Sequence, residues 1–253
     1  TNLVTTYSNM FTGATAMIGN QNAPTTPILT YFNPTTPITT SNIRAAVNAW
    51  VADSATATTT YGHIKNWNTS QVTSMANLFE SKTLFNDDIS DWDTSQVTDM
   101  YFMFASARAF NQPIGNWDVS NVTRMDYMFY DAWVFNQPIG NWNVSNVTNM
   151  SLMFYEARAF NQPIGNWDVS KVTNMYYMFG YVYWAFNQPI GNWNVSNVTN
   201  MSYMFTEARA FNQNITGWNT TAVTNYANMF NWATAMIANQ SASTTPTSSY
   251  FNQ

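Results

Sequence analysis

Few side chains in this sequence have the types and spacing that chemistry requires. Histidine occurs once, at His63, and cysteine does not occur. A lone imidazole has no second histidine with which to hold a metal ion, and the chain offers no thiolate. The densest charge is a cluster of aspartates whose oxygens could surround Ca²⁺. Its members are Asp87, Asp88, Asp91, Asp93 and Asp99. The cluster lacks EF-hand spacing, so a solvated acidic loop is the favoured interpretation and a calcium site the alternative.

Acid and base catalysis also lacks candidates. Asp118 and Asp168 alternate with Asn143 and Asn194 at one position of a repeat, which favours hydrogen bonding along a ladder. Glycoside cleavage needs one unique pair of carboxylates with separated pKa values, and the repeated aspartates are all copies. We therefore expect neither an enzyme nor a cofactor.

Glycosylation is the modification that the sequence allows most often. Asn-x-Ser/Thr sequons are dense, and each marks a surface asparagine only where it is exposed. Three of them share one repeat position: Asn121, Asn146 and Asn197. Most sequons follow from the repeated motif itself, which weakens each of them as evidence. If the source is a eukaryote or a virus of one, we expect a few to carry glycan.

The composition limits the partners. Charged residues make up 8% of the chain and aromatic residues 17%, and 8 basic against 13 acidic groups give a net charge of −5. The chain has the aromatic content of a folded protein but not the basic surface of a nucleic-acid or anionic-membrane binder. Its apolar runs are too short to span a bilayer. It begins at Thr1 with neither an initiator methionine nor a signal peptide, so we expect a processed or internal piece of a longer protein.

A repeat must position all of these groups. Tryptophans recur at intervals of 25 or 26 residues: Trp67, Trp92, Trp117, Trp142, Trp167, Trp193 and Trp218. Valine, methionine and phenylalanine follow each tryptophan at fixed distances, with Tyr226 replacing methionine in the last unit. A unit of this length cannot bury its hydrophobic face alone and is stable only when stacked. The periodicity predicts an α/β solenoid of about seven coils, with the tryptophans as a buried column.

Apolar spacing within one unit indicates its secondary structure. Close alternation over residues 114–119 predicts a short parallel strand. Apolar residues three or four positions apart over residues 122–132 predict a short helix, with Ser120 or Thr123 available to cap it. The asparagines that follow the repeated phenylalanine are expected to form an amide ladder along the turns: Asn86, Asn111, Asn136, Asn161, Asn187 and Asn212.

A separate helix is expected before the first unit. Apolar residues from Ile43 to Val51 lie on one helical face, and Ser41 is available as the N-cap. An uncovered end of a solenoid invites aggregation, so this helix is predicted to cap the first coil.

The repeated motif is specific enough to indicate a family. Residues Asn116 to Phe129 read Asn-Trp-Asp-Val-Ser-Asn-Val-Thr-Arg-Met-Asp-Tyr-Met-Phe. This motif resembles the unit of the BspA-like leucine-rich-repeat surface proteins. The resemblance extends from Asn66 to Phe230, and the segment from Ala45 to Ile64 resembles the one that opens such arrays. It implies an extracellular or surface protein used for adhesion or as structural material, without enzyme activity.

A longer period concerns the ends of the chain. Residues 4–33 match residues 223–252 at a constant offset of 219. The match divides the chain into the tail of a preceding block (1–33), a linker and helical cap (34–65), the repeat solenoid (66–237) and a Thr/Ser/Pro-rich connector to a next block (238–253). Both matching segments are expected to share a helical turn and an extended connector, which leaves the C-terminus pointing away from its own solenoid. A connector folded back on its coils would instead indicate an isolated surface domain.

The leading functional interpretation is a structural block of an extracellular filament or surface appendage, built from tandem solenoid blocks that associate with identical or similar ones. The alternative is a cell-surface adhesin or carbohydrate-binding module that uses exposed aromatics: Tyr127, Tyr177, Tyr203 and Trp184. One unit carries an added residue beside Tyr181, Tyr183 and Trp184, which is the best candidate for contact with another copy or a ligand. The expected partners are therefore further blocks, glycans or host-surface proteins, at an extracellular, cell-surface or virion-surface location.

Overall fold

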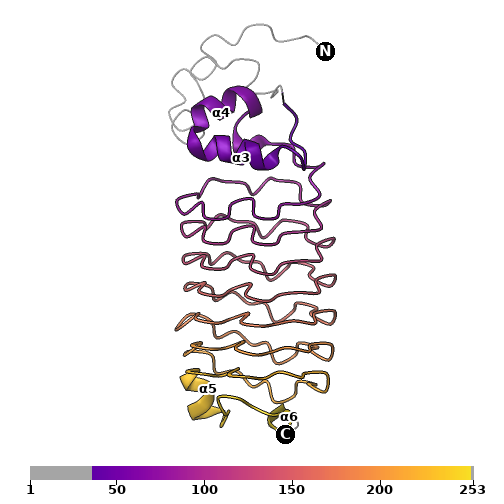
Figure 1. The fold of residues 1–253 in the computed structure, drawn as a ribbon, viewed down its shortest axis with the longest axis vertical. Helices are drawn as coiled ribbons and strands as arrows, with labels where there is room; N and C mark the ends of the chain where they lie inside the picture. Colours follow the sequence, from indigo (N-terminus) through magenta and orange to yellow (C-terminus); the bar gives the residue numbers. More distant parts are fainter. Residues whose placement is uncertain (1–35, 252–253) are drawn as a thin grey trace.

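The protein forms an elongated stack of coils with helices at both ends (Figure 1). The computed structural model describes residues 36–251. The expectations for residues 1–33, including a conformation shared with the C-terminal segment, lie outside this range. The domain division stays a prediction. The helices are α3 (Ile43–Ala52), α4 (Ser54–Tyr61), the 3-10 helix η1 (Ile64–Asn66), α5 (Thr234–Asn239) and α6 (Ser248–Phe251).

Successive coils are joined by isolated parallel bridges. Within the described residues these bridges link one residue of each coil to the next: Ser74, Asp99, Arg124, Asn149, Asn174, Asn200 and Asn225. We number the coils 1 to 7 by these residues. Beside each bridge a threonine N–H donates a hydrogen bond to the equivalent threonine carbonyl of the preceding coil, as Thr123 N–H does to Thr98 C=O at 2.9 Å. The predicted α/β solenoid is wrong, because the coils within residues 36–251 pair through single bridges and turns rather than through parallel strands and coil helices.

The segment expected to be helical is a run of turns. In coil 3 the N–H of Phe129 donates to the carbonyl of Met153 in the next coil at 2.9 Å, whereas Ala132 donates to Phe129 within its own coil at 3.2 Å. Alternate N–H groups thus donate to the next coil and to their own coil, so the continuous hydrogen bonding of a helix does not form. A turn with a hydrogen bond between residues i and i+3 places side chains three positions apart on the same side, as a helix does. Apolar spacing alone therefore does not separate the two structures.

The turns hold bulky residues in left-handed backbone. One column has φ between 51° and 60°, and it comprises Phe102, Tyr127, Leu152, Tyr177 and Tyr203. Large side chains rarely adopt this region because the Cβ atom crowds the backbone. Hydrogen bonds between coils stabilise it, such as Tyr127 N–H to Ser151 C=O at 2.9 Å. The direction in which this column projects is therefore set by the whole stack.

The core consists of columns of like side chains. The repeated tryptophans are 1–4% exposed. Beyond the first, each indole Nε1 donates to an isoleucine carbonyl of the preceding unit, as Trp142 does to Ile114 at 3.1 Å. Phenylalanine rings stack beside them, with Phe129 and Phe154 centroids 5.7 Å apart and planes 6° from parallel. These columns make each coil depend on its neighbours.

The amide ladder expected at the turns is confirmed. The N–H of Asn136 donates to Oδ1 of Asn111 at 2.9 Å, and Gln137 Nε2 donates to the Asn111 carbonyl at 2.8 Å. The same bond between backbone and amide recurs up to Asn212. The ladder gives the turns partners that strands would otherwise supply.

Helices α3 and α4 cover coil 1 (Figure 1). The N-cap of α3 is Asn42 and not Ser41, and no side chain caps the helix. Asn42 instead bonds backwards, accepting from Thr39 N–H at 2.8 Å. The end of α3 is tied to the coils by Trp50, whose Nε1 donates to Asp87 at 2.7 Å. The buried face of α3 comprises Ile43, Ala46, Val47 and Trp50.

The C-terminal segment folds back over coil 7. Phe251 of α6 stacks on Trp218 with ring centroids 6.4 Å apart, and Phe230 N–H donates to Thr244 C=O at 3.0 Å. Tyr250 and Phe251 are buried. The prediction of an extended connector pointing away from the coils is therefore wrong, because this segment covers an aromatic edge that the last coil would otherwise expose. The argument for a continuous fibre joined end to end fails with it.

Candidate functional site

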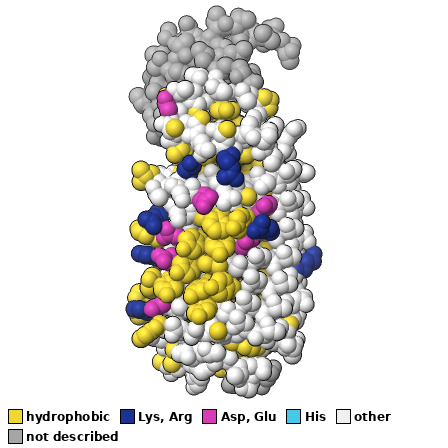
Figure 2. Space-filling view, in the orientation of Figure 1, with side chains coloured by type: hydrophobic (Ala, Val, Ile, Leu, Met, Phe, Trp, Pro, Cys, Tyr) yellow, Lys and Arg dark blue, Asp and Glu magenta, His cyan; other side chains and the backbone are white. Residues whose placement is uncertain are grey.

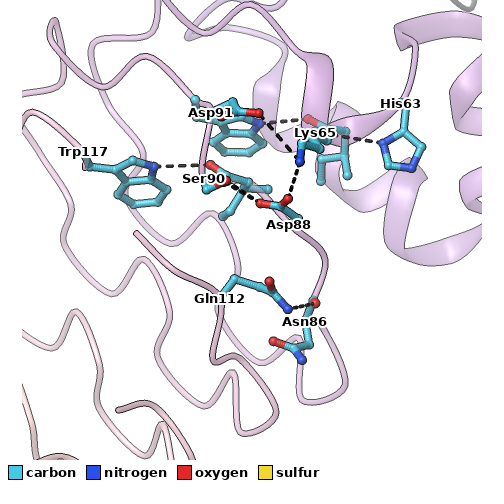
Figure 3. A network of polar contacts seen from close by, with 11 residues as sticks. His63, Lys65, Asn86, Asp88, Ser90, Asp91, Gln112 and Trp117 are labelled. Carbon is cyan, nitrogen blue, oxygen red and sulfur yellow. Dashed lines mark hydrogen bonds and ion pairs between the residues drawn. The ribbon is translucent and has the colours of Figure 1, made fainter. Parts of the chain in front are cut away.

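Charged groups near the first coil hold the cap against the stack (Figure 3). Lys65 donates to Asp88 at 2.6 Å and lies 3.8 Å from Asp91. Burial opposes ionisation of Asp88, but Lys65 and Ser90 outweigh it and lower the pKa of this carboxyl to about 2. His63 Nδ1 accepts from Lys65 N–H at 3.3 Å, and burial lowers the pKa of the imidazole. Each of these groups therefore contacts a neighbouring residue of the cap or of coil 1, and together the contacts hold the cap on the stack.

The candidate calcium ligands do not converge on one point. Asp87 accepts from Trp50 Nε1 at 2.7 Å, and Asp93 accepts from Ser95 N–H at 2.9 Å. The carboxylates of Asp88 and Asp91 face Lys65, and Asp99 accepts from Tyr101 N–H at 3.0 Å. Within residues 36–251, no three His, Cys, Asp or Glu side chains are grouped as a metal ion would need.

The aspartates and asparagines after the repeated tryptophan close turns. Asp118 accepts from Ser120 N–H at 2.9 Å, and Asn143 accepts from Ser145 N–H at 3.2 Å. Hydrogen bonds from Ser120 lower the pKa of Asp118. Either residue type supplies the acceptor oxygen, which explains why the two alternate between coils.

The three sequon asparagines at one repeat position support the stack. Asn121 Nδ2 donates to Ser95 C=O at 2.8 Å, and Asn146 Nδ2 donates to Ser120 C=O at 2.7 Å. Asn197 makes the equivalent bond at 2.7 Å. An N-linked glycan is attached at this nitrogen, so modification would weaken a contact between coils. Glycosylation here stays a prediction.

A cluster of aromatic rings covers one face of the stack, the contiguous hydrophobic area of Figure 2. We call it the aromatic face. It comprises Tyr101, Phe102, Tyr127, Tyr130, Tyr155, Tyr176, Tyr177 and Tyr203. Ring centroids are 4.2 Å apart between Phe102 and Tyr127, with planes 22° from parallel. Tyr177 and Tyr203 are 4.5 Å apart, with planes 10° from parallel. Rings stacked in this way cover each other's faces and present edges and hydroxyls to solvent.

The tyrosines of the aromatic face are half-buried. Within residues 36–251 their hydroxyls have no hydrogen-bond partner. Burial raises the pKa of Tyr127, Tyr130 and Tyr155, and it raises the pKa of Tyr177 to about 12. The phenols of these four tyrosines therefore stay protonated at neutral pH, and each offers both a donor and an acceptor.

The corner beside the aromatic face alternates arginine with aromatic rings. Arg108 lies over Trp133 with its guanidinium carbon 4.0 Å from the ring centroid, and Arg158 lies 4.5 Å from the same ring. Such cation–π contacts stabilise the column. Arg108 also pairs with Asp131 at 2.8 Å. We call this corner the arginine edge; it comprises Arg108, Trp133, Arg158, Tyr183, Trp184 and Arg209.

The residues beside the one-residue insertion join the two surfaces. The Tyr181 ring lies 5.3 Å from Tyr155 of the aromatic face and 6.0 Å from Tyr183 of the arginine edge. Trp184 is 68% exposed and lies 5.8 Å from the Arg209 guanidinium. The structure thus brings the three predicted interaction residues onto one continuous surface.

Sequence reasoning picked out aromatic residues singly and missed the arginine edge. Arg108, Arg158 and Arg209 recur 50 and 51 residues apart, in every second unit. This second period was present in the sequence, but its meaning depends on which side chains the coils bring together.

One further structural finding concerns membranes. Among residues 36–251, no helix has both the length and the apolar character needed to cross a bilayer.

Comparison with known proteins assigns a family. One family matches the chain twice, over residues 47–164 and 132–244. No curated protein and no solved structure matches it. Membership of the BspA-like leucine-rich-repeat family, expected from the motif at 116–129, is wrong, because the matched family is a different one with a different repeat. The two matches together span most of the sequence, and the chain therefore belongs to the family described as Mycoplasma protein of unknown function, DUF285.

Proposed function

We propose that the chain is a structural block of a surface or extracellular assembly and associates side by side with like blocks through its aromatic face. The observation that carries the proposal is the half-buried column of stacked rings at the surface, such as Tyr177 and Tyr203 with centroids 4.5 Å apart. Tyrosine gives a large contact area at low cost in conformational entropy. Backbone hydrogen bonds between coils already hold this column rigid, so little freedom is lost on association.

The charges beside the aromatic face are paired within the chain, which favours a partner surface that also has little uncompensated charge. Arg124 pairs with Asp126 at 3.0 Å and lies over the Tyr101 ring at 4.2 Å. Its charge is therefore compensated within the chain. Since only 8% of residues are charged, two copies approach each other without strong repulsion.

A matching period also supports association between copies. Parallel coils repeat at roughly 4.8 Å, and the stacked pairs Phe102–Tyr127 and Tyr177–Tyr203 have ring centroids 4.2 Å and 4.5 Å apart. A second stack presents the same spacing, so contacts made at one coil are repeated at the next. Sugar binding has less support, because sugars stack on free ring faces whereas Phe102 and Tyr127 cover one another at 4.2 Å.

A paired substitution tests the proposal. In sedimentation velocity over a range of concentrations, we expect the wild-type chain to form a dimer or larger assembly. Tyr177→Ser with Tyr203→Ser should shift the chain toward monomer while far-UV circular dichroism stays unchanged. The matched control replaces Asn166 and Asn192, exposed residues of the same two coils, by serine and should associate normally. A wild type that is monomeric throughout, or a tyrosine variant that associates normally, contradicts the proposal.

A further inference from the structure

Within residues 36–251 six large apolar side chains are exposed, and those of Leu84, Val134 and Trp184 share one corner of the stack. The other three are Val51, Trp232 and Ile237. Val51 and Leu84 line one hollow beside coil 1. At the other end α5, which carries Ile237, is tied to this corner because Ala235 N–H donates to Arg209 C=O at 3.3 Å. Apolar side chains gathered along one side of a stack mark an interaction surface.

Large and small side chains alternate along this corner. Leu84, Val134 and Trp184 occupy coils 1, 3 and 5 and are 88%, 44% and 68% exposed. The same position in coils 2, 4 and 6 holds alanine: Ala109, Ala159 and Ala210. At roughly 4.8 Å per coil, the large side chains stand about 10 Å apart with a gap over each alanine. The corner is therefore a row of projections and gaps of equal spacing.

We propose that this corner pairs with the same corner of a second copy, antiparallel, about a two-fold axis between coils 3 and 4. Coil 1 then faces coil 6, coil 3 faces coil 4 and coil 5 faces coil 2. Each projecting side chain of one copy, such as Trp184, enters the gap over an alanine of the other, such as Ala109. A two-fold interface uses one self-complementary surface twice and closes on itself. The inference rests on the proposed side-by-side association; it extends the contact from the aromatic face to the adjoining corner and adds the orientation of the two copies.

The same orientation provides an occupant for the hollow beside coil 1. This hollow has a volume of about 580 Å³ and is lined by Trp50, Val51 and Leu84 among others. In the antiparallel pair it faces coil 7 of the second copy, where Trp232 is 61% exposed. The hollow also has polar walls, which include Asp53, Ser54 and Lys82, and an indole suits both kinds of wall because it has an apolar ring and an N–H donor. This correspondence is independent of the alternation in coils 1 to 6.

The charges of the corner suit a second copy. Arg108 pairs with Asp131 at 2.8 Å. Arg158 and Arg209 each pair with a glutamate of their own coil at 2.7 Å. No arginine of the corner therefore needs a carboxylate from the partner, and two like corners meet without an excess of either charge.

Cysteine cross-linking tests the orientation, since the full chain contains no cysteine. Leu84→Cys mixed with Ala210→Cys should give a disulfide-linked heterodimer, because coils 1 and 6 face each other within the Cα separation of about 4–7 Å that a disulfide spans. Leu84→Cys alone should not cross-link, because the two copies of coil 1 lie at opposite ends of the pair. A cross-link between Leu84→Cys and Ala109→Cys indicates parallel pairing and overturns the proposal.

Dissociation constants separate this inference from the proposed function. Trp184→Ala and Trp232→Ala should each weaken the dimer by about tenfold or more, while Asn166→Ser leaves it unchanged. If the wild-type chain stays monomeric, both proposals fail. If it associates but neither tryptophan variant weakens the dimer and coils 1 and 6 do not cross-link, the corner pairing fails and association through the aromatic face stands.

Discussion

Replacing Trp142 by alanine removes a buried side chain from the middle of the stack. The indole is 3% exposed, and its Nε1 donates to the Ile114 carbonyl at 3.1 Å. Truncating a large buried aromatic costs about 3–5 kcal/mol, and a buried carbonyl left without a partner costs about 1–3 kcal/mol. We expect Trp142→Ala to lower the free energy of unfolding by about 4–8 kcal/mol. That is a large part of the roughly 5–15 kcal/mol that stabilises a typical domain.

Trp142→Phe separates the two contributions. Phenylalanine keeps most of the apolar contact but has no N–H for Ile114, so we expect it to cost about 1–3 kcal/mol. Urea denaturation followed by far-UV circular dichroism measures both variants. If Trp142→Ala unfolds at the parent midpoint, the column does not stabilise the stack. If Trp142→Phe lowers the free energy of unfolding as much as Trp142→Ala does, burial of the ring is not the main source of the stability that Trp142 provides.

Glycine substitutions and pH titrations examine other contacts of the stack. Gly140→Ala places a Cβ against the Pro163 carbonyl oxygen of the next coil and should lower the free energy of unfolding by about 1–3 kcal/mol. The control Gly217→Ala meets nothing within 4 Å and should lower it less. Equal thermal midpoints for the two variants would argue against such close contact between coils. Burial raises the pKa of Tyr177 from 10.0 to about 12, so the stability from its neutral form is present below pH 10 and lost between pH 10 and about 12. Tyrosinate absorbance that rises entirely at the ordinary phenol pKa would contradict that burial. Burial also lowers the pKa of His63 from 6.5, so its stabilisation is present above pH 6.5 and lost as the pH falls below it. His63→Gln should flatten this acid slope, and a wild-type midpoint unchanged below pH 6.5 would count against it.

Repeat spacing predicted the side-chain columns because identical residues in a stack must face their copies. Asn111 illustrates this, since its amide oxygen accepts from Asn136 N–H at 2.9 Å as the ladder required. Such contacts need only the period and the stacking direction. They do not need the backbone conformation of the coil.

The backbone itself could not be predicted from apolar spacing. Met125 and Met128 are three positions apart, and both a helix and a turn with a bond from i to i+3 bury that pair. The choice depends on bonds to other coils, such as Tyr127 N–H to Ser151, which pattern analysis of one unit does not contain. The left-handed φ of 60° at Tyr127 carries no sequence signal either, because glycine is absent there.

The C-terminal cover and the arginine edge also depend on tertiary contacts. Phe251 belongs to a Thr/Ser-rich segment, whose composition suggests a connector, yet its ring stacks on Trp218 with centroids 6.4 Å apart. Arg108 and Trp133 belong to different units and meet only because the coils stack. In both cases the relevant partner lies about one coil or more away in sequence, beyond the window of local pattern reasoning.

Small-angle X-ray scattering of the full chain tests side-by-side association most directly. The antiparallel pair should have the mass of a dimer, while its maximum dimension stays close to that of one stack. Two blocks joined end to end would instead nearly double that dimension. We predict dimeric mass at nearly monomeric length. A dimer of nearly doubled length, or a monomer at every concentration, would contradict the account.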